Sequence, residues 1–399
     1  MPTDFAALRA QISQAAQKAD DSVRARRDAI AALRRVTAAG FDVGQLTAAC
    51  VAAAGNPALR WNGAVFNLGE EIHRQYAFGR EPNRYALLAS DGSQIMPDRH
   101  KAVVYALIQV ACVSFVYGDG DGGLSAPPDA AATHRDLRLL SEDELYRSDA
   151  GDLISAGELA TERDLREIEV LAERCEVFAR AGLQTVALAD GSLVPFALLS
   201  DPRLKAGDAR LARFAAALER LRECKSIVAG FITRPSSNAV VKACALAGVK
   251  YQDVSAALRT DPTPRGVMDR QLLEGWLEPW RRSAVFVPNW AINGGEFLGR
   301  FGHVMCACYA NVSDGKAEIA RVELPAWCAD GPSLDTLTGI LGRHARIGGG
   351  YPFCLKAAHE EAVITRQDQR EVDFRLQFEL SEKGLLAGPS PKQEAKDRG

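Results

Sequence analysis

Two short apolar segments, residues 85–90 and 185–189, each run directly into the tripeptide Asp-Gly-Ser. Apolar runs of five or six residues are typical of strands buried on both faces of a sheet, and Asp-Gly is a common turn dipeptide. A single Asp-Gly-Ser is more often a structural turn, because Asp favours turns and caps helices. Two copies after matched apolar segments weaken that explanation. They predict a sheet in which two buried strands each end in an aspartate.

Strand and helix patterns alternate around this pair. Residues 141–181 carry Glu, Arg and Leu at helical spacing, residues 202–225 form a basic helical pattern, and residues 226–232 read as a further strand. The apolar segment 102–117 is long enough for two strands. The alternation predicts an α/β fold with a mixed sheet flanked by helices.

The two ends of the chain differ in composition from the part between them. Residues 4–55 are rich in Ala, Arg, Gln and Leu at helical spacing, which predicts a helical arm for dimerisation or docking, or a helix packed on its own domain. The last residues are rich in Pro, Lys and Glu and cannot bury a core. We therefore predict an arm over 1–80, a main domain over 81–385 and a disordered tail over 386–399.

Composition excludes several classes of protein. With 47% hydrophobic and 25% charged residues, the chain is neither disordered nor fibrous. It has no secretory signal and no apolar run long enough to span a membrane, so we expect it in the cytoplasm. Its nine cysteines are odd in number and scattered, as expected of reduced core thiols. A net charge of −3 means that any DNA contact must use local basic clusters or bound cations.

Asp91 and Asp190 are the strongest candidates for chemistry. An Asp at the carboxyl end of a buried strand lies at the edge of the sheet where α/β proteins bind ligands. Two such carboxylates on adjacent strands would need a cation between them. Their hard oxygens suit Mg²⁺ or Mn²⁺, which can activate water and clamp phosphate oxygens, so the pair predicts phosphodiester hydrolysis. A phosphatase or nucleotide hydrolase with the same chemistry stays open.

A third carboxylate is expected from the helix before the second strand. Glu167 is preferred to Glu169 because Ile168 and Leu171 on its flank can seat that turn on the sheet. A solvated helix charge is the alternative explanation for Glu167.

A C-terminal motif supplies further candidates. Lys356 and His359 are three residues apart and share one face of a predicted helix, shortly after Tyr351. His359 could bind a metal or transfer a proton, Lys356 could neutralise a phosphate, and Tyr351 could hydrogen-bond or stack on a nucleotide. A lone helical histidine is usually structural.

Other cations could hold DNA phosphates. Arg234, before Pro235, could contact a phosphate in a bidentate manner, and a structural ion pair is an equal alternative. The same two explanations apply to Arg99, His100 and Lys101, which follow the first Asp-Gly-Ser.

Six ordered motifs together resemble those of NurA-domain nucleases over roughly residues 80–380. They are ASDGSQIMPDRH (89–100), RDLREIEVLAE (163–173), ALADGSLVPF (187–196), FITRPSSNAVVK (231–242), ARVELPAW (320–327) and GYPFCLKAAHEEAVI (350–364). The resemblance implies an RNase H-like fold and a manganese-dependent exonuclease, or single-strand endonuclease, acting on single- and double-stranded DNA. It also implies a homodimer that works with a HerA-type hexameric ATPase in DNA end resection and repair.

The resemblance carries family roles to individual positions. It implies metal ligation at Asp91 and Asp190, a third acidic residue at Glu167, and roles for Tyr351 and His359 in the C-terminal motif. An inactive scaffold or docking subunit for a DNA-translocating ATPase is the competing function. The acidic residues are intact, which favours an active nuclease, because crowded carboxylates without a catalytic duty only cost stability.

Overall fold

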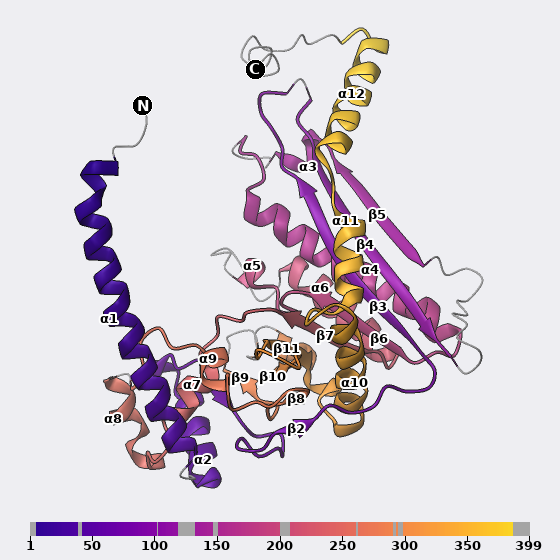
Figure 1. Ribbon diagram of the computed structural model, residues 1–399. Coiled ribbons are helices and arrows are strands. Elements are labelled where there is room, and N and C mark those ends of the chain that lie inside the picture. The colour runs from indigo at the N-terminus through magenta and orange to yellow at the C-terminus, as the bar shows by residue number, and fades with distance from the viewer. Residues whose placement is uncertain are drawn as a thin grey trace. The chain divides into compact units, whose positions relative to one another are not determined.

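The computed structural model describes residues 5–38, 42–101, 103–118, 132–146, 151–199, 208–260, 262–289, 293 and 298–385 (Figure 1). The chain divides into two compact units. Unit 1 comprises residues 1–78, 232–293 and 304–322, and unit 2 comprises residues 79–231, 294–303 and 323–399. The predicted tail, 386–399, lies outside the described residues.

Unit 2 is built on a mixed sheet. Its strands, in chain order, are β3 (Tyr85–Ile95), β4 (Ala106–Tyr117), β5 (Thr133–Leu140), β6 (Thr185–Asp190) and β7 (Ile227–Ile232). They lie in the order β7-β6-β3-β4-β5, with β3, β4 and β5 antiparallel and β3, β6 and β7 parallel. The predicted mixed α/β sheet flanked by helices is therefore confirmed.

Helices cover both faces of this sheet. They are α3 (Glu142–Leu145), α4 (Ala156–Arg180), α5 (Phe196–Leu199), α6 (Ala209–Glu223), α10 (Gly331–Ile347), α11 (Phe353–Ala362) and α12 (Arg366–Glu382), with 3-10 turns at Leu298–Phe301 and Ala326–Cys328. Both α4 and α11 pack on β3, β4 and β6. A Cβ on Gly92 would point at α4, whereas the neighbouring Asp91 side chain bonds to α11, so the two helices lie on opposite faces.

At the first Asp-Gly-Ser the predicted turn is wrong. Asp91, Gly92 and Ser93 do not form a turn, because β3 continues through them to Ile95 in register with β4. The segment expected to hold two strands is the single strand β4, which is long enough to pair with all of β3. Asp91 therefore lies within a strand rather than at its end.

The second Asp-Gly-Ser does end its strand. β6 stops at Asp190, and Gly191 has a φ of 88°, a conformation that favours glycine. Glu323 stabilises this turn, because it accepts hydrogen bonds from Ser192 Oγ at 2.5 Å and from the Leu193 amide at 3.1 Å. Glu323 belongs to the motif at 320–327, so that motif positions the turn next to Asp190.

Helix α4 shows why its sequence folds as it does. Ser155 and Glu158 form a capping box at its start, and Leu165, Ile168 and Leu171 make the buried face. The helical pattern predicted over 141–181 is thus a short helix and a long one. Helices α10 and α12 were not identified from the sequence, although α10 begins with an Asp330 cap and a proline in its first turn.

Unit 1 contains the predicted N-terminal helices. Its elements are α1 (Phe5–Ala38), α2 (Val43–Ala54), β1 (Ala64–Val65), β2 (Tyr76–Ala77), α7 (Ala239–Cys244), α8 (Val254–Arg259), α9 (Asp269–Leu273), β8 (Arg281–Arg282), β9 (Val287–Pro288) and β10 (Met305–Asn311), with 3-10 turns at Pro57–Leu59 and Tyr251–Asp253. β11 (Ile319–Pro325) has residues in both units.

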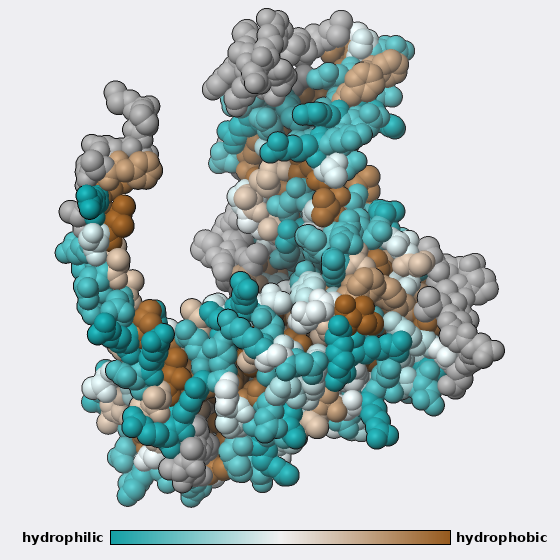
Figure 2. All heavy atoms as spheres, in the orientation of Figure 1, coloured by the Kyte–Doolittle hydropathy of each residue, from teal (hydrophilic) through white to brown (hydrophobic). Residues whose placement is uncertain are grey.

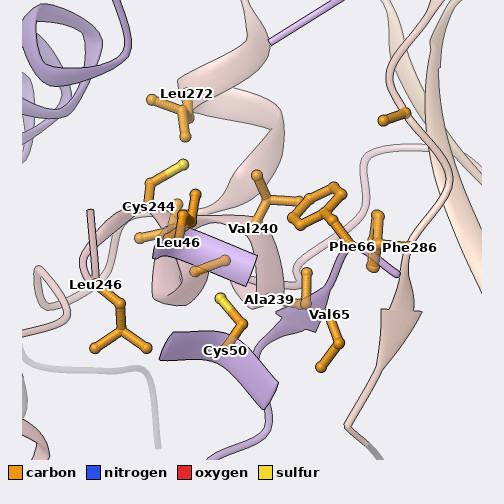
Figure 3. Packing of buried hydrophobic residues seen from close by; sticks show 14 of the residues in the cluster. Leu46, Cys50, Val65, Phe66, Ala239, Val240, Cys244, Leu246, Leu272 and Phe286 are labelled. Atoms are coloured by element: carbon orange, nitrogen blue, oxygen red, sulfur yellow. The ribbon is translucent and has the colours of Figure 1, made fainter. Parts of the chain in front are cut away.

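The helices of unit 1 share one core with later segments of the chain. Leu46 and Cys50 of α2 pack with Val240 and Cys244 of α7 and with Phe286 (Figure 3). Arg34 of α1 donates hydrogen bonds to the carbonyls of Leu272 and Gln271 at 3.1 and 2.9 Å. The end of α1 is therefore packed on its own unit.

One face of the surface is mostly polar, and the cysteines behave as the thiols that the sequence predicts. The face in Figure 2 is largely hydrophilic, with apolar side chains scattered among polar ones. No disulfide joins any of the nine cysteines, all of which lie in the described residues, and burial raises the pKa of Cys306 to about 12 and that of Cys308 to about 11. Among the described helices, none combines the length and apolar character that crossing a membrane requires.

Candidate metal centre

Three side chains from three elements of unit 2 meet at one point. Asp91 comes from the middle of β3, Asp190 from the end of β6 and His359 from α11. One potential ligand atom of each lies within 4.8 Å of the others, and His359 Nδ1 is 2.7 Å from Asp91 Oδ2. The predicted convergence of the two aspartates follows from the parallel register of β3 and β6, whose last pair is Ser90 with Ala189.

The electrostatics of this point favour a cation. Burial raises the pKa of Asp190 above its ordinary value, and the carboxylate of Asp91 adds to that shift. A hydrogen bond from Tyr351 to Asp190 acts in the opposite direction. Two oxygen donors and one imidazole nitrogen suit Mg²⁺ or Mn²⁺, and a divalent cation would remove the repulsion between the carboxylates.

Glu167 faces the same region from α4. Burial, reinforced by Asp164, Asp91 and Asp190, raises its pKa to about 8, and Arg163 opposes the rise. Its Oε1 atom is buried and makes no hydrogen bond to any described residue. Glu167 is not one of the three residues that cluster within 4.8 Å, so its role as a ligand stays a prediction.

Gly92 makes the approach of Glu167 possible. A Cβ at position 92 would lie 2.5 Å from Glu167 Oε1 and 2.9 Å from Cγ of Arg163. Since the first of these atoms is a buried carboxylate oxygen, any larger residue would displace it. The glycine of the first Asp-Gly-Ser therefore serves close packing rather than a turn.

The alternative carboxylate, Glu169, lies in another environment. It accepts a hydrogen bond from Arg213 Nε at 2.8 Å and lies 3.4 Å from a terminal nitrogen of Arg166. Both contacts are on the side of α4 that faces away from Glu167. Of the two glutamates that the sequence left open, only Glu167 lines the region of Asp91 and Asp190.

A cavity of about 300 Å³ opens at this point. Its lining includes Asp91, Asp190, Glu167 and Arg163, together with the turn after β6. The carboxylates therefore face a space that can admit a metal ion and part of a substrate.

Family membership follows from a domain comparison. The NurA domain model matches residues 85–364, from the first residue of β3 to just beyond α11. The chain belongs to the NurA family. The matched range contains all five residues to which the sequence motifs assign catalytic roles.

Solved structures give a weaker likeness. A crystal structure of NurA with manganese is 11% identical, with a TM-score of 0.38, and covers 79% of this chain and 92% of its own. A second, of NurA bound to dAMP and manganese, is 13% identical, with a TM-score of 0.36, and covers 74% and 88%. These TM-scores are too low to argue from, so membership rests on the domain match. No curated protein matches the chain.

The three candidate residues of the C-terminal NurA motif lie in different surroundings. Tyr351 hydrogen-bonds to Asp190 and packs edge-on against Phe231, with ring centroids 6.0 Å apart. His359 contacts Asp91, whereas Lys356 is 60% exposed and lies 3.7 Å from Glu360 Oε1. The motif thus brings Tyr351 and His359 to the aspartates and leaves Lys356 in an exposed ion pair.

Arg234 lies in unit 1 of this NurA-family chain, not in the unit that holds the aspartates. It is exposed, with a φ of 47°, so its backbone is in the left-handed region. Its predicted contact with DNA stays a prediction.

Two residues of the site were not singled out from the sequence. Arg163 lies with Nε 3.1 Å from Glu167 Oε1 and with a terminal nitrogen 2.8 Å from Asp164 Oδ1. Burial raises the pKa of Asp164, with Asp91 adding to the shift. The signal was available, because Arg163 and Glu167 are four residues apart and so share one face of a helix.

Proposed function

We propose that this NurA-family protein is a manganese- or magnesium-dependent DNA nuclease that hydrolyses phosphodiester bonds at single- and double-stranded ends. The observation that carries the proposal is the convergence of Asp91, Asp190 and His359, from three elements, to within 4.8 Å. Such a set of hard oxygen and imidazole donors, open to a cavity, is the chemistry of a catalytic divalent-cation site. NurA proteins have been crystallised with manganese and with dAMP.

The protein's own residues have separate tasks in this proposal. Asp91, Asp190 and His359 would hold the cation, which when bound lowers the pKa of water and stabilises charge on phosphate oxygens. Tyr351 donates a hydrogen bond to Asp190 and so fixes the direction of that carboxylate. Glu167 is the candidate fourth donor, since it lines the same cavity as both aspartates and its buried Oε1, 3.1 Å from Arg163 Nε, makes no hydrogen bond to the described residues.

Arg163 would complete the site as a cation of the protein itself. It lies against Glu167 and Asp164, and its side chain is 30% exposed in the cavity that contains the aspartates. A guanidinium in that position can neutralise a carboxylate before substrate binds and contact a phosphate afterwards.

We further propose, on the family resemblance, a homodimer that acts in DNA end resection with a HerA-type hexameric ATPase. The sequence contains no Gly-x-x-x-x-Gly-Lys loop, so energy for movement along DNA would have to come from such a partner.

Cleavage of end-labelled single- and double-stranded DNA, with manganese, magnesium or EDTA, tests the nuclease proposal. We expect products only with metal, and none from Asp91→Ala or Asp190→Ala. Glu169→Gln is the matched control, because it removes a carboxylate from α4 that lies outside the cavity. Cleavage that persists in both aspartate variants would refute the site. No cleavage by the wild type under any condition, with or without the ATPase, would favour the scaffold function.

A further inference from the structure

A second and larger cavity of unit 2, of about 700 Å³, lies beyond the end of β3. We call it the β3-end cavity, and its polar lining consists of Gln94, Asp98, Arg99, His100, Thr365, Arg366 and Gln369. Ile95, Met96, Ile154 and Ile364 add apolar surface. The cavity thus combines positive charge with apolar side chains.

The β3-end cavity and the metal centre lie along the same strand, and no described residue lines both. Three successive contacts join β3 to the chain from α11 to α12: Asp91 with His359, the Ser93 hydroxyl with the Ala362 carbonyl, and Ile95 packed against Ile364. β3 and α11, which carry two of the three proposed ligands, therefore run side by side towards the cavity. From Asp91 to Ile95 an extended strand advances roughly 13 Å. That length spans only a few nucleotides of a DNA strand.

The two arginines of this cavity form no ion pair in the described parts of the chain. Arg99, His100 and Arg366 are exposed, and none of them forms an ion pair with any acid in the described parts of the chain. Lys101, directly beside them, differs because its Nζ is 2.6 Å from Asp373 Oδ1. The first turn of α12 is already capped by Thr365 and Asp368, so the side-chain cations, not the helix end, supply the positive charge.

We propose that the β3-end cavity binds the DNA strand a few nucleotides from the scissile phosphate, with backbone phosphates on Arg99 and Arg366. Sugars and bases of the same strand lie on the apolar side chains of the lining, such as Met96. This inference rests on the proposed nuclease function and adds the path that the substrate takes. DNA is favoured over a peptide because unpaired arginines are aligned with a phosphodiesterase centre.

The test compares Arg99→Gln/Arg366→Gln with wild type in binding a fluorescein-labelled thymidine 12-mer, in EDTA, over a range of salt concentrations. Each phosphate contact to a single strand contributes roughly 0.7 to the slope of log K against log salt. We expect that slope to fall in magnitude by about 1.4, and the affinity to fall roughly 10-fold at low salt. Both residues are exposed, so the melting temperature should stay close to that of the wild type.

Arg375→Gln is the matched control. Arg375 is nine residues after Arg366 on the same helix, and nine steps of about 100° place it on the opposite face. In the described parts of the chain its one ion pair is an exposed contact with Glu371, so its loss removes one charge without disturbing the cavity. We expect wild-type binding and an unchanged salt slope for this variant.

A cleavage assay separates failure of this inference from failure of the nuclease proposal. With manganese, the ratio of kcat/KM for the 12-mer to that for a thymidine dinucleotide should fall roughly 10-fold in the double variant. Wild-type cleavage with unchanged binding and an unchanged ratio would overturn the inference alone and leave the cavity to a protein partner. An equal loss in Arg375→Gln would also overturn it. A wild type that neither cleaves nor binds DNA would overturn both.

Discussion

The two sides of helix α4 carry similar residues in opposite situations. On the outer side, Arg166 binds Asp136 and Glu173 at 2.7 and 2.9 Å, and Arg213 binds Glu169 at 2.8 Å. On the inner side, Glu167 lies beside Arg163 and faces three further carboxylates, those of Asp164, Asp91 and Asp190. The outer side is matched in charge within the protein, whereas the inner side is not.

This difference separates a charge-matched surface cluster from the candidate site. The hydrogen bond from Arg166 lowers the pKa of Asp136, so that carboxylate is stabilised in its charged form. Burial raises the pKa of Glu167 to about 8, so its charged form is destabilised. A protein gains nothing from such unmatched acids unless a ligand completes them, which is why the inner side indicates a site.

The largest expected effect is on catalysis. Asp190→Asn should lower the rate of metal-dependent DNA cleavage at least 1,000-fold, about 4 kcal/mol, because it removes a proposed ligand. Glu169→Gln, on the outer side, should stay within about 3-fold of wild type. Single-turnover cleavage assays measure both. Equal losses in the two variants would remove the distinction between the sides.

A smaller effect is expected on stability without metal. Glu167→Gln should raise the free energy of unfolding at pH 7.5 by about 2 kcal/mol. The reason is that Glu167 is ionised in the unfolded chain but must take up a proton to be buried, whereas an amide has no such cost. Denaturant titration in EDTA measures this change. Adding manganese should stabilise the wild type more than the variant. A destabilised variant would mean that Glu167 is already satisfied within the protein.

Buried His344 belongs to neither side and offers a comparison with a neutral group. Burial, with help from Arg343, lowers its pKa to about 4, and its Nε2 lies 3.0 Å from the Tyr117 hydroxyl. His344 is therefore protonated near pH 6.5 in the unfolded chain but only near pH 4 in the folded protein. The contribution of neutral His344 to the free energy of unfolding is fully present above pH 6.5 and is lost as the pH falls towards 4.

The expected loss from His344 is about 2 kcal/mol between pH 7 and pH 5. His344→Gln should remove most of this pH dependence, whereas the exposed His73→Gln should leave it in place. Urea unfolding at both pH values makes the comparison. If the two variants behave alike, His344 is not the source of the acid sensitivity.

The smallest effect concerns the outer side itself. Arg213→Gln breaks contacts with Glu169 and Glu162 that are 18% and 25% exposed, and should cost about 1 kcal/mol or less. Half of that cost should disappear in high salt, because partly exposed ion pairs are screened. Thermal unfolding at low and high salt measures it. A loss of several kcal/mol would show that the outer network also contains poorly solvated charge.

Local patterns in the chain were sufficient for the fold class and for the core of the site. Apolar runs predicted the buried strands, and the two Asp-Gly-Ser copies predicted that Asp91 and Asp190 would meet. Helical spacing favoured Glu167 without excluding Glu169, and only the structure shows that Glu167 lines the cavity. These inferences succeed because strand and helix periodicity are properties of neighbouring residues.

Tertiary structure decided the rest. β3 continues through its Asp-Gly-Ser because β4 offers a full-length antiparallel partner, and β6 ends at its copy because Glu323 holds the following turn. Gly92 is required by a glutamate that arrives from another helix, and Arg99 and Arg366 share a cavity only after the chain has folded. Each of these facts depends on groups far apart in the sequence, whose approach no local pattern encodes.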